Sequence, residues 1–191
     1  MPVCKGGVYL VALTPDARSS NLATAACPLS HAALEAWLHR RPELRLDRKR
    51  PTVDELAERL ATFWLSDEIV LYIGQTTDTL AARIHAYYTT PLGARHPHAG
   101  GHWLKPLSNL DSLFVHYAYA GDPEAAEVLM LKRFCDTVTP TMRSALHDPN
   151  CPLPYANLEW PKGHVWPGGN RKRHGLRGTR EPRLCIDPVM P

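Results

Sequence analysis

Hydrophobic positions along the chain alternate or run together in three short stretches, and this pattern predicts three strands. The first stretch, residues 6–14, is opened by glycines and closed by a proline at 15. The second, residues 67–74, is almost continuously apolar up to a glycine, which is typical of a buried strand ending in a tight turn. The third, residues 113–120, alternates between apolar and polar positions as a half-buried strand does.

Two amphipathic helices are predicted between the first and second strands. One begins after Ser30 and is limited by Pro42. The other begins at Thr52 and Glu55, whose spacing matches a capping box, and carries an apolar stripe on one face. We therefore interpret residues 15–66 as a helical insertion between the first two strands.

Two further helices follow the second and third strands. The first of them is expected to be capped by Thr77 or Asp78, and the second to begin with Asp122 as its N-cap. Between them, residues 89–112 are predicted to form a long loop, and residues 140–147 could add a short helix. The predicted fold is α/β of the α+β type, with a small, mainly antiparallel three-stranded sheet flanked by helices.

Composition narrows the class of protein. The chain has 191 residues and is 44% hydrophobic, which is enough for one domain with a substantial core. No apolar run approaches the length of a transmembrane helix, and the N-terminal run reads as a strand rather than a signal peptide. The five cysteines contain no CxxC pair, which favours free thiols in a reducing compartment. We expect a cytoplasmic protein with no membrane partner.

Charge is unevenly distributed along the chain. Residues 162–183 hold seven basic residues and one acidic residue, which gives this stretch a net charge of +6. Because the net charge of the whole chain is +3, the remaining residues together carry −3. A basic, glycine-rich stretch is typical of a polyanion-binding segment, but also of a solvated tail. We therefore divide the chain into a domain at 1–160 and a basic Gly/Pro-rich tail at 161–191.

Six polar or aromatic residues stand at the ends or on the faces of the predicted elements. Arg83 and Tyr87 are separated by four positions and so share one helix face. Taken singly, each of the six is an ordinary core or surface residue; only their joint occurrence in this order points to a functional site. The six are Tyr9, Tyr72, Arg83, Tyr87, Glu127 and Asn157.

These residues and their order resemble the GIY-YIG nuclease family. "GVY" at 7–9 and "YIG" at 72–74 match the two halves of the name, "AEVLMLKRF" resembles its acidic helix, and "PYANLEW" is similar to its Asn-containing segment. The resemblance covers residues 6–10, 69–88 and about 112–158. Two features depart from it: the half-motif tyrosines are 63 positions apart, where the family has a short connection, and Gln75 stands where some members have a lysine.

The resemblance implies a metal-dependent endonuclease that hydrolyses DNA phosphodiester bonds, of a restriction-like or defensive type. It assigns Tyr9 as general base, Arg83 to the phosphate and Glu127 to a divalent cation, Mg²⁺ or Mn²⁺. Tyr72 and Tyr87 would orient water or phosphate, and Asn157 would tie the last segment to the site. An unperturbed tyrosine, with a pKa of about 10, is a poor base at neutral pH, so Tyr9 would need positive charge nearby.

DNA is the expected partner, with RNA not excluded, and the protein is expected to be a monomer or a homodimer. The basic stretch supplies the candidate nucleic-acid contacts, Arg171, Lys172, Arg173, Arg177 and Arg180. The basic segment 40–50 of the insertion is a second candidate, for DNA or for a dimer contact. Three histidines at 96, 98 and 102 suggest either a metal site or, as we favour, a DNA-contacting loop.

Two alternatives remain open at this stage. The chain could be a non-catalytic nucleic-acid-binding protein that retains the nuclease fold. It could also be a structural or regulatory protein with a basic tail, which predicts no dependence on divalent cations. Restriction, repair, mobile-element and toxin roles share this catalytic core, and the fold does not choose among them.

Overall fold

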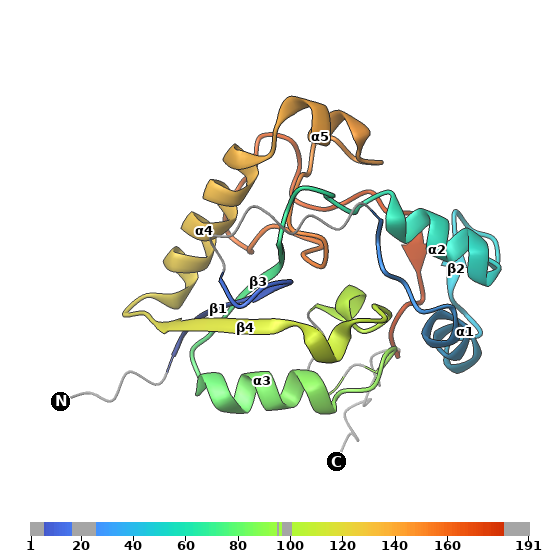
Figure 1. Cartoon of the computed structure of the whole chain (residues 1–191), viewed down its shortest axis with the longest axis horizontal. Helices are drawn as coiled ribbons and strands as arrows, with labels where there is room; N and C mark the ends of the chain where they lie inside the picture. The colour runs from blue at the N-terminus through green and yellow to red at the C-terminus, as the bar shows by residue number, and fades with distance from the viewer. Residues whose placement is uncertain (1–5, 17–25, 95, 97–100, 182–191) are drawn as a thin grey trace, which may run out of the picture.

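A three-stranded antiparallel sheet lies at the centre of the molecule in a computed structural model (Figure 1), which describes residues 6–16, 26–94, 96 and 101–181. Its strands are β1 (Gly7–Ala12), β3 (Val70–Thr76) and β4 (Phe114–Tyr119), in the order β3-β1-β4. Both neighbouring pairs are antiparallel. The prediction of a mixed fold with a small antiparallel sheet and helices inserted after the first strand is confirmed.

Helices lie on both sides of this sheet. α3 (Leu80–Thr89) and α4 (Pro123–Thr137) are on opposite sides of it in Figure 1. Two buried clusters match this layering: one joins Val11 to Tyr87 of α3, and the other joins Ile73 to Leu131 of α4. The sheet is therefore buried from both faces near its centre.

The insertion after β1 contains α1 (His31–Arg40), the two-residue strand β2 (Arg45–Leu46) and α2 (Val53–Ala61). The predicted capping box is present: the Thr52 side chain accepts a hydrogen bond from the Glu55 backbone, and the Glu55 carboxylate accepts one from the Thr52 backbone. β2 pairs with β5 (Leu176–Arg177), so the insertion is joined to the C-terminal part of the chain.

The remaining elements are short. Two 3-10 turns, η1 (His102–Leu104) and η2 (Leu110–Ser112), occupy the predicted loop between α3 and β4, and α5 (Pro140–Ala145) forms where a short helix was considered. None of the helices in the described ranges is long and apolar enough to cross a membrane.

The start of α3 differs from the prediction. Its N-cap is Thr79, whose hydroxyl accepts a hydrogen bond from the Ala82 backbone, and not Thr77 or Asp78. The reason is that β3 continues past Gly74 to Thr76, and the Thr76 hydroxyl then accepts a hydrogen bond from the Asp78 backbone. This turn delays the helix by one to two residues. By contrast, Asp122 caps α4 as predicted.

Candidate active site

The two motif tyrosines lie together on one face of the sheet. Tyr9 of β1 is opposite Gly74 of β3, and Tyr72 is opposite Val11, two positions along from Tyr9. Side chains two positions apart on a strand point to the same face. The tyrosine rings accordingly contact each other, with centroids 5.9 Å apart and planes tilted by 45°.

Gly74 makes this contact possible. A Cβ atom at this position would lie 2.7 Å from Cε1 of Tyr72 and 2.9 Å from Cζ of Tyr9. Both distances are well inside van der Waals contact, so any side chain larger than hydrogen would displace at least one ring. The glycine of the "YIG" stretch is thus required by close packing against the tyrosine pair.

Arg83 approaches the tyrosine pair from α3. The Nε atom of Arg83 and the hydroxyl of Tyr9 are both buried, and neither makes a hydrogen bond of standard geometry among the described residues. The Tyr9 hydroxyl nevertheless lies close enough to the Arg83 and Tyr72 side chains for both to lower its pKa by hydrogen bonding. Burial raises the pKa of Tyr9 above its ordinary value, and the positive charge of Arg83 opposes this rise. Buried polar atoms without partners are uncommon in folded proteins, and here two of them belong to neighbouring side chains.

Tyr87, one turn after Arg83, is held in place by the segment that follows α3. Its hydroxyl donates a hydrogen bond to the Gly101 carbonyl at 3.2 Å, and its own backbone carbonyl accepts one from Lys105 Nζ at 2.7 Å. The same ammonium group lies 4.4 Å from the centre of the Tyr87 ring. Burial raises the pKa of Tyr87 above its ordinary range.

Glu127 is placed by α4, which packs on β3 and β1. Burial raises the pKa of its carboxyl from an ordinary 4.5 to about 7, while the charge of Arg83 lowers it and Glu124 raises it. Glu127 and Arg83 form no direct ion pair within 4.0 Å, although each carries a charge that the other would neutralise. Glu127 also acts on both tyrosines, since its negative charge raises their pKa values.

Asn157 lies at the free edge of β3. Its side-chain oxygen accepts a hydrogen bond from the Ile73 N–H at 2.9 Å, and its side-chain nitrogen donates one to the Ile73 carbonyl at 2.8 Å. The Ala156 N–H also donates to the Leu71 carbonyl. Asn157 therefore fixes the backbone between Tyr72 and Gly74 and acts as a positioning residue.

The structure thus brings together five of the six side chains, Tyr9, Tyr72, Arg83, Tyr87 and Glu127, and places Asn157 directly behind them. Sequence reasoning missed Lys105, which holds Tyr87 and whose own pKa is lowered by burial to about 8. Lys105 lies just after a 3-10 turn, where no periodic pattern distinguishes it from a surface lysine.

One of the candidate nucleic-acid contacts, Lys172, is buried. Lys172 is 3% exposed, and its Nζ donates hydrogen bonds to the carbonyls of Pro154 and Tyr155. Burial also lowers its pKa to about 7. An ammonium group enclosed in this way supports the "PYAN" segment, which is a structural role that the sequence did not indicate.

The other basic candidates differ in their surroundings. Arg171 is exposed and pairs with Glu159 at 3.0 Å, and Arg173 and Arg177 are exposed. Arg180 is half-buried, and its carbonyl accepts a hydrogen bond from Arg41. Among the three histidines considered as a group, His102 is buried and His98 lies outside the described residues.

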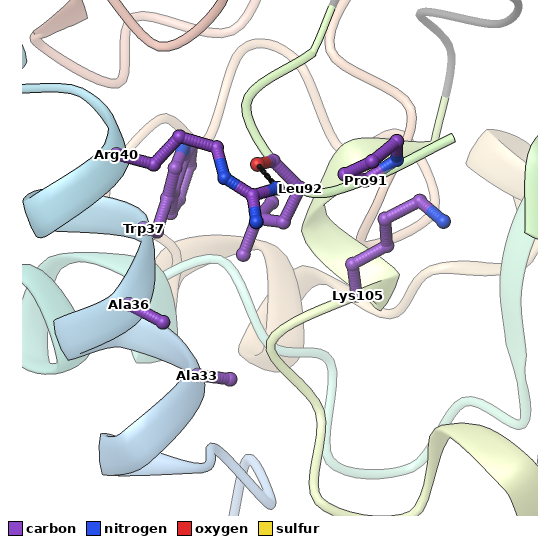
Figure 2. Close-up of a pocket in the computed structure, with 7 residues that line it drawn as sticks. All are labelled: Ala33, Ala36, Trp37, Arg40, Pro91, Leu92 and Lys105. Atoms are coloured by element: carbon purple, nitrogen blue, oxygen red, sulfur yellow. Dashed lines mark hydrogen bonds between the residues drawn. The ribbon is translucent and has the colours of Figure 1, made fainter. Parts of the chain in front are cut away.

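A separate pocket of about 270 Å³ lies between α1 and the segments around 91 and 105 (Figure 2). In Figure 2 the Arg40 side chain reaches over to the Leu92 carbonyl, to which it donates a hydrogen bond at 2.9 Å. The pocket is lined by Ala33, Ala36, Trp37, Arg40, Pro91, Leu92 and Lys105. Lys105 also contacts Tyr87, but none of the six candidate site residues lines the pocket, so the pocket lies beside the candidate site and not within it.

Comparison with known proteins gives no match: no protein-family model, curated protein or solved structure is significantly similar to this chain.

Proposed function

We propose that the protein is a metal-dependent endonuclease that hydrolyses DNA phosphodiester bonds. The observation that carries the proposal is the convergence of Tyr9, Arg83 and Glu127, from three separate elements, around the Tyr72 ring. Their charges are close enough for Arg83 to lower the pKa values of both Tyr9 and Glu127. Perturbed titratable groups that converge from distant parts of a chain are typical of catalytic sites.

Arg83 is proposed to bind the scissile phosphate. A guanidinium group presents a rigid fork of N–H donors that matches two phosphate oxygens. Its Nε has no partner among the described residues, so it can donate to a substrate oxygen without losing an existing hydrogen bond. The same charge would stabilise the additional negative charge that develops on phosphate during hydrolysis.

The donor set fits a hydrated Mg²⁺ or Mn²⁺ better than an ion enclosed by protein ligands. No group of three or more His, Cys, Asp or Glu side chains that could hold an ion is found within the described parts of the chain. Mg²⁺ keeps several of its waters and binds through one or two carboxylates together with substrate phosphates. Glu127 would supply that carboxylate; when bound, the cation would neutralise phosphate charge and stabilise the leaving oxygen.

Tyr9 is proposed to take the proton of the attacking water. Its raised pKa means that the hydroxyl is protonated at neutral pH in the arrangement described here. The base role therefore requires positive charge beside the hydroxyl beyond that of Arg83. Tyr72 and Tyr87 would orient water and phosphate, and the exposed arginines Arg171, Arg173 and Arg177 would contact DNA away from the reacting bond.

A second candidate is a non-catalytic nucleic-acid-binding protein with the same fold. The burial of the site favours it: Tyr9 is 4% exposed and Tyr87 is 7% exposed. A substrate phosphate must reach the Tyr9 hydroxyl for hydrolysis, whereas simple binding at the exposed arginines needs no such access.

Plasmid cleavage separates these proposals. Supercoiled DNA is incubated with the protein in Mg²⁺ or in EDTA, beside the variant Glu127→Ala. The endonuclease proposal predicts nicked or linear DNA in Mg²⁺ only, and strongly reduced cleavage by the variant. Cleavage that is indifferent to both EDTA and the substitution would refute it, and DNA binding without any cleavage would favour the second candidate.

A further inference from the structure

The pairing of β2 with β5 joins two basic stretches that are far apart in the sequence. Arg45 lies directly opposite Arg177, although the two residues are 132 positions apart in the chain. Side chains of directly opposed residues project to the same side of a sheet, and like charges in this position repel each other. The pairing thus brings the two basic stretches side by side, although the Arg45 guanidinium itself donates hydrogen bonds to the Pro42 and Leu44 carbonyls.

The turn that follows β2 adds to this concentration of charge. Leu46 and Lys49 exchange backbone hydrogen bonds of 2.8 and 2.9 Å, so Asp47 and Arg48 are the two central residues of a tight hairpin turn. Both have positive φ, 47° and 73°. Glycine and asparagine are strongly preferred where such turns need positive φ, and arginine is an unusual choice there. The turn therefore presents the exposed, positively charged side chain of Arg48 at its tip.

Acidic neighbours neutralise only part of this charge. Ion pairs join Arg41 to Glu43, Arg59 to Asp47 and Arg171 to Glu159. Four exposed basic side chains within three residues of β2 or β5 make neither an ion pair nor a side-chain hydrogen bond within the described residues. They are Arg48, Lys49, Arg173 and Arg177.

The half-buried ring of His174, two residues before β5, lies near several basic side chains. Its pKa is lowered to about 4, first by burial and then by the positive charges of Arg171, Lys172, Arg59 and Arg180. Several positive charges therefore lie near β5 in addition to the exposed residues named above. In Figure 1, β2 and β5 lie on the opposite side of the molecule from α4, which carries Glu127.

We propose that Arg48, Lys49, Arg173 and Arg177 form one composite surface that binds the phosphate backbone of duplex DNA. The choice of DNA as the polyanion rests on the proposed function. The positions of the four basic residues come from the structure and do not depend on that proposal. A surface on the side away from α4 would hold a second part of the duplex while the reacting phosphate lies at Arg83. Neither basic stretch forms this surface alone, because each supplies half of its charges.

The test measures DNA binding in EDTA, where metal-dependent cleavage cannot occur. Fluorescence anisotropy of a labelled duplex is recorded against salt concentration for the variants R48N/K49Q and R173Q/R177Q. Asn replaces Arg48 because it tolerates positive φ. The matched control is K132Q/R133Q, which removes the same charge from exposed positions on α4. Thermal melting of each variant checks that it is folded.

Each surface variant is expected to bind roughly tenfold more weakly, and the slope of log K against log salt is expected to become shallower by about 1.8, as for two lost phosphate contacts. The control is expected to change the slope by less than about 0.5. Equal effects of all three variants, or an effect of only one of the two surface variants, would overturn the composite surface.

The binding measurements test the composite surface independently of the proposed nuclease activity. Weakened binding of both surface variants supports the surface even if the wild-type protein never cleaves DNA. Conversely, Mg²⁺-dependent cleavage by the wild type together with unaltered binding by both variants overturns the surface alone. If one double variant does not fold, the corresponding single variants R48N, K49Q, R173Q and R177Q replace it, each with an expected slope change of about 0.9.

Discussion

The side-chain amide of Asn157 forms two hydrogen bonds with the backbone of a single residue, Ile73, accepting from its N–H and donating to its carbonyl. Both backbone groups of Ile73 therefore point to the free edge of β3, away from β1. Since Ile73 stands between Tyr72 and Gly74, this amide holds the strand that presents the tyrosine pair.

Replacing Asn157 with leucine is expected to destabilise the protein by about 2–4 kcal/mol, because a buried N–H and a buried carbonyl lose their partners together. Urea unfolding measures the change. Asn150 is exposed, and no hydrogen bond of its side chain is described, so Asn150→Leu is the control. A loss for Asn157→Leu as small as that of the control would show that the edge of β3 does not depend on this amide.

Gly74→Ala is expected to cost about 1–3 kcal/mol and to reduce any DNA cleavage, because the new methyl group forces the Tyr9 and Tyr72 rings apart. Gly121→Ala is the matched control: a Cβ there would have no neighbour within 4 Å. Differential scanning calorimetry and a cleavage assay on both variants give the comparison. A fully stable and active Gly74→Ala protein would contradict the packing described here.

The pKa of Glu127 predicts how stability changes with pH. Because this pKa is raised from 4.5 to about 7, the folded protein retains a proton over a range in which the unfolded chain has lost it. The contribution of Glu127 to stability is thus present below pH 4.5 and is lost as pH rises through 7. Glu127→Gln should therefore be as stable as the wild type at pH 4 and about 1–3 kcal/mol more stable at pH 8.

Denaturant titrations of wild type and Glu127→Gln at the two pH values measure this difference, provided that divalent cations are removed with EDTA. An equal difference at pH 4 and pH 8 would mean that the carboxyl titrates normally and is not desolvated in the folded protein.

Lys172→Met tests whether the buried Lys172 has a structural role and not a role in DNA binding. The substitution removes the donor to the Pro154 and Tyr155 carbonyls, and we expect a loss of about 1–3 kcal/mol in stability with unchanged DNA affinity. Chemical unfolding and anisotropy are the measurements. Weakened DNA binding without a change in stability would place the Lys172 side chain at the surface instead.

The sequence predicted helix boundaries best where they depend on residues that are close together in the chain. The capping box at Thr52 and Glu55 and the Asp122 cap of α4 could be predicted because each depends on residues within one turn of the helix. The Thr79 cap was missed because it depends on where β3 ends, and the boundaries of elements are poorly determined by periodicity.

Long-range relationships were harder to predict. The candidate site was identified from the order of six residues, but the contact of Gly74 with both tyrosine rings depends on the register of β1 against β3. Strands of two residues such as β2 and β5 carry no periodic signal, so their pairing could not be foreseen. The basic neighbours of Lys172 in the sequence predict an exposed side chain, but in the structure the Lys172 side chain is buried.

The most direct test of the proposed nuclease centre is the single-turnover rate of duplex cleavage in Mg²⁺ for wild type, Glu127→Gln and Asp136→Asn. Both substitutions remove one carboxylate from α4, but Asp136 is exposed near the end of the helix, away from Arg83. We predict that Glu127→Gln slows cleavage on the order of 100-fold or more and that Asp136→Asn changes the rate less than about twofold. Cleavage by Glu127→Gln at the wild-type rate would contradict the assignment of Glu127 and, with it, the proposed centre.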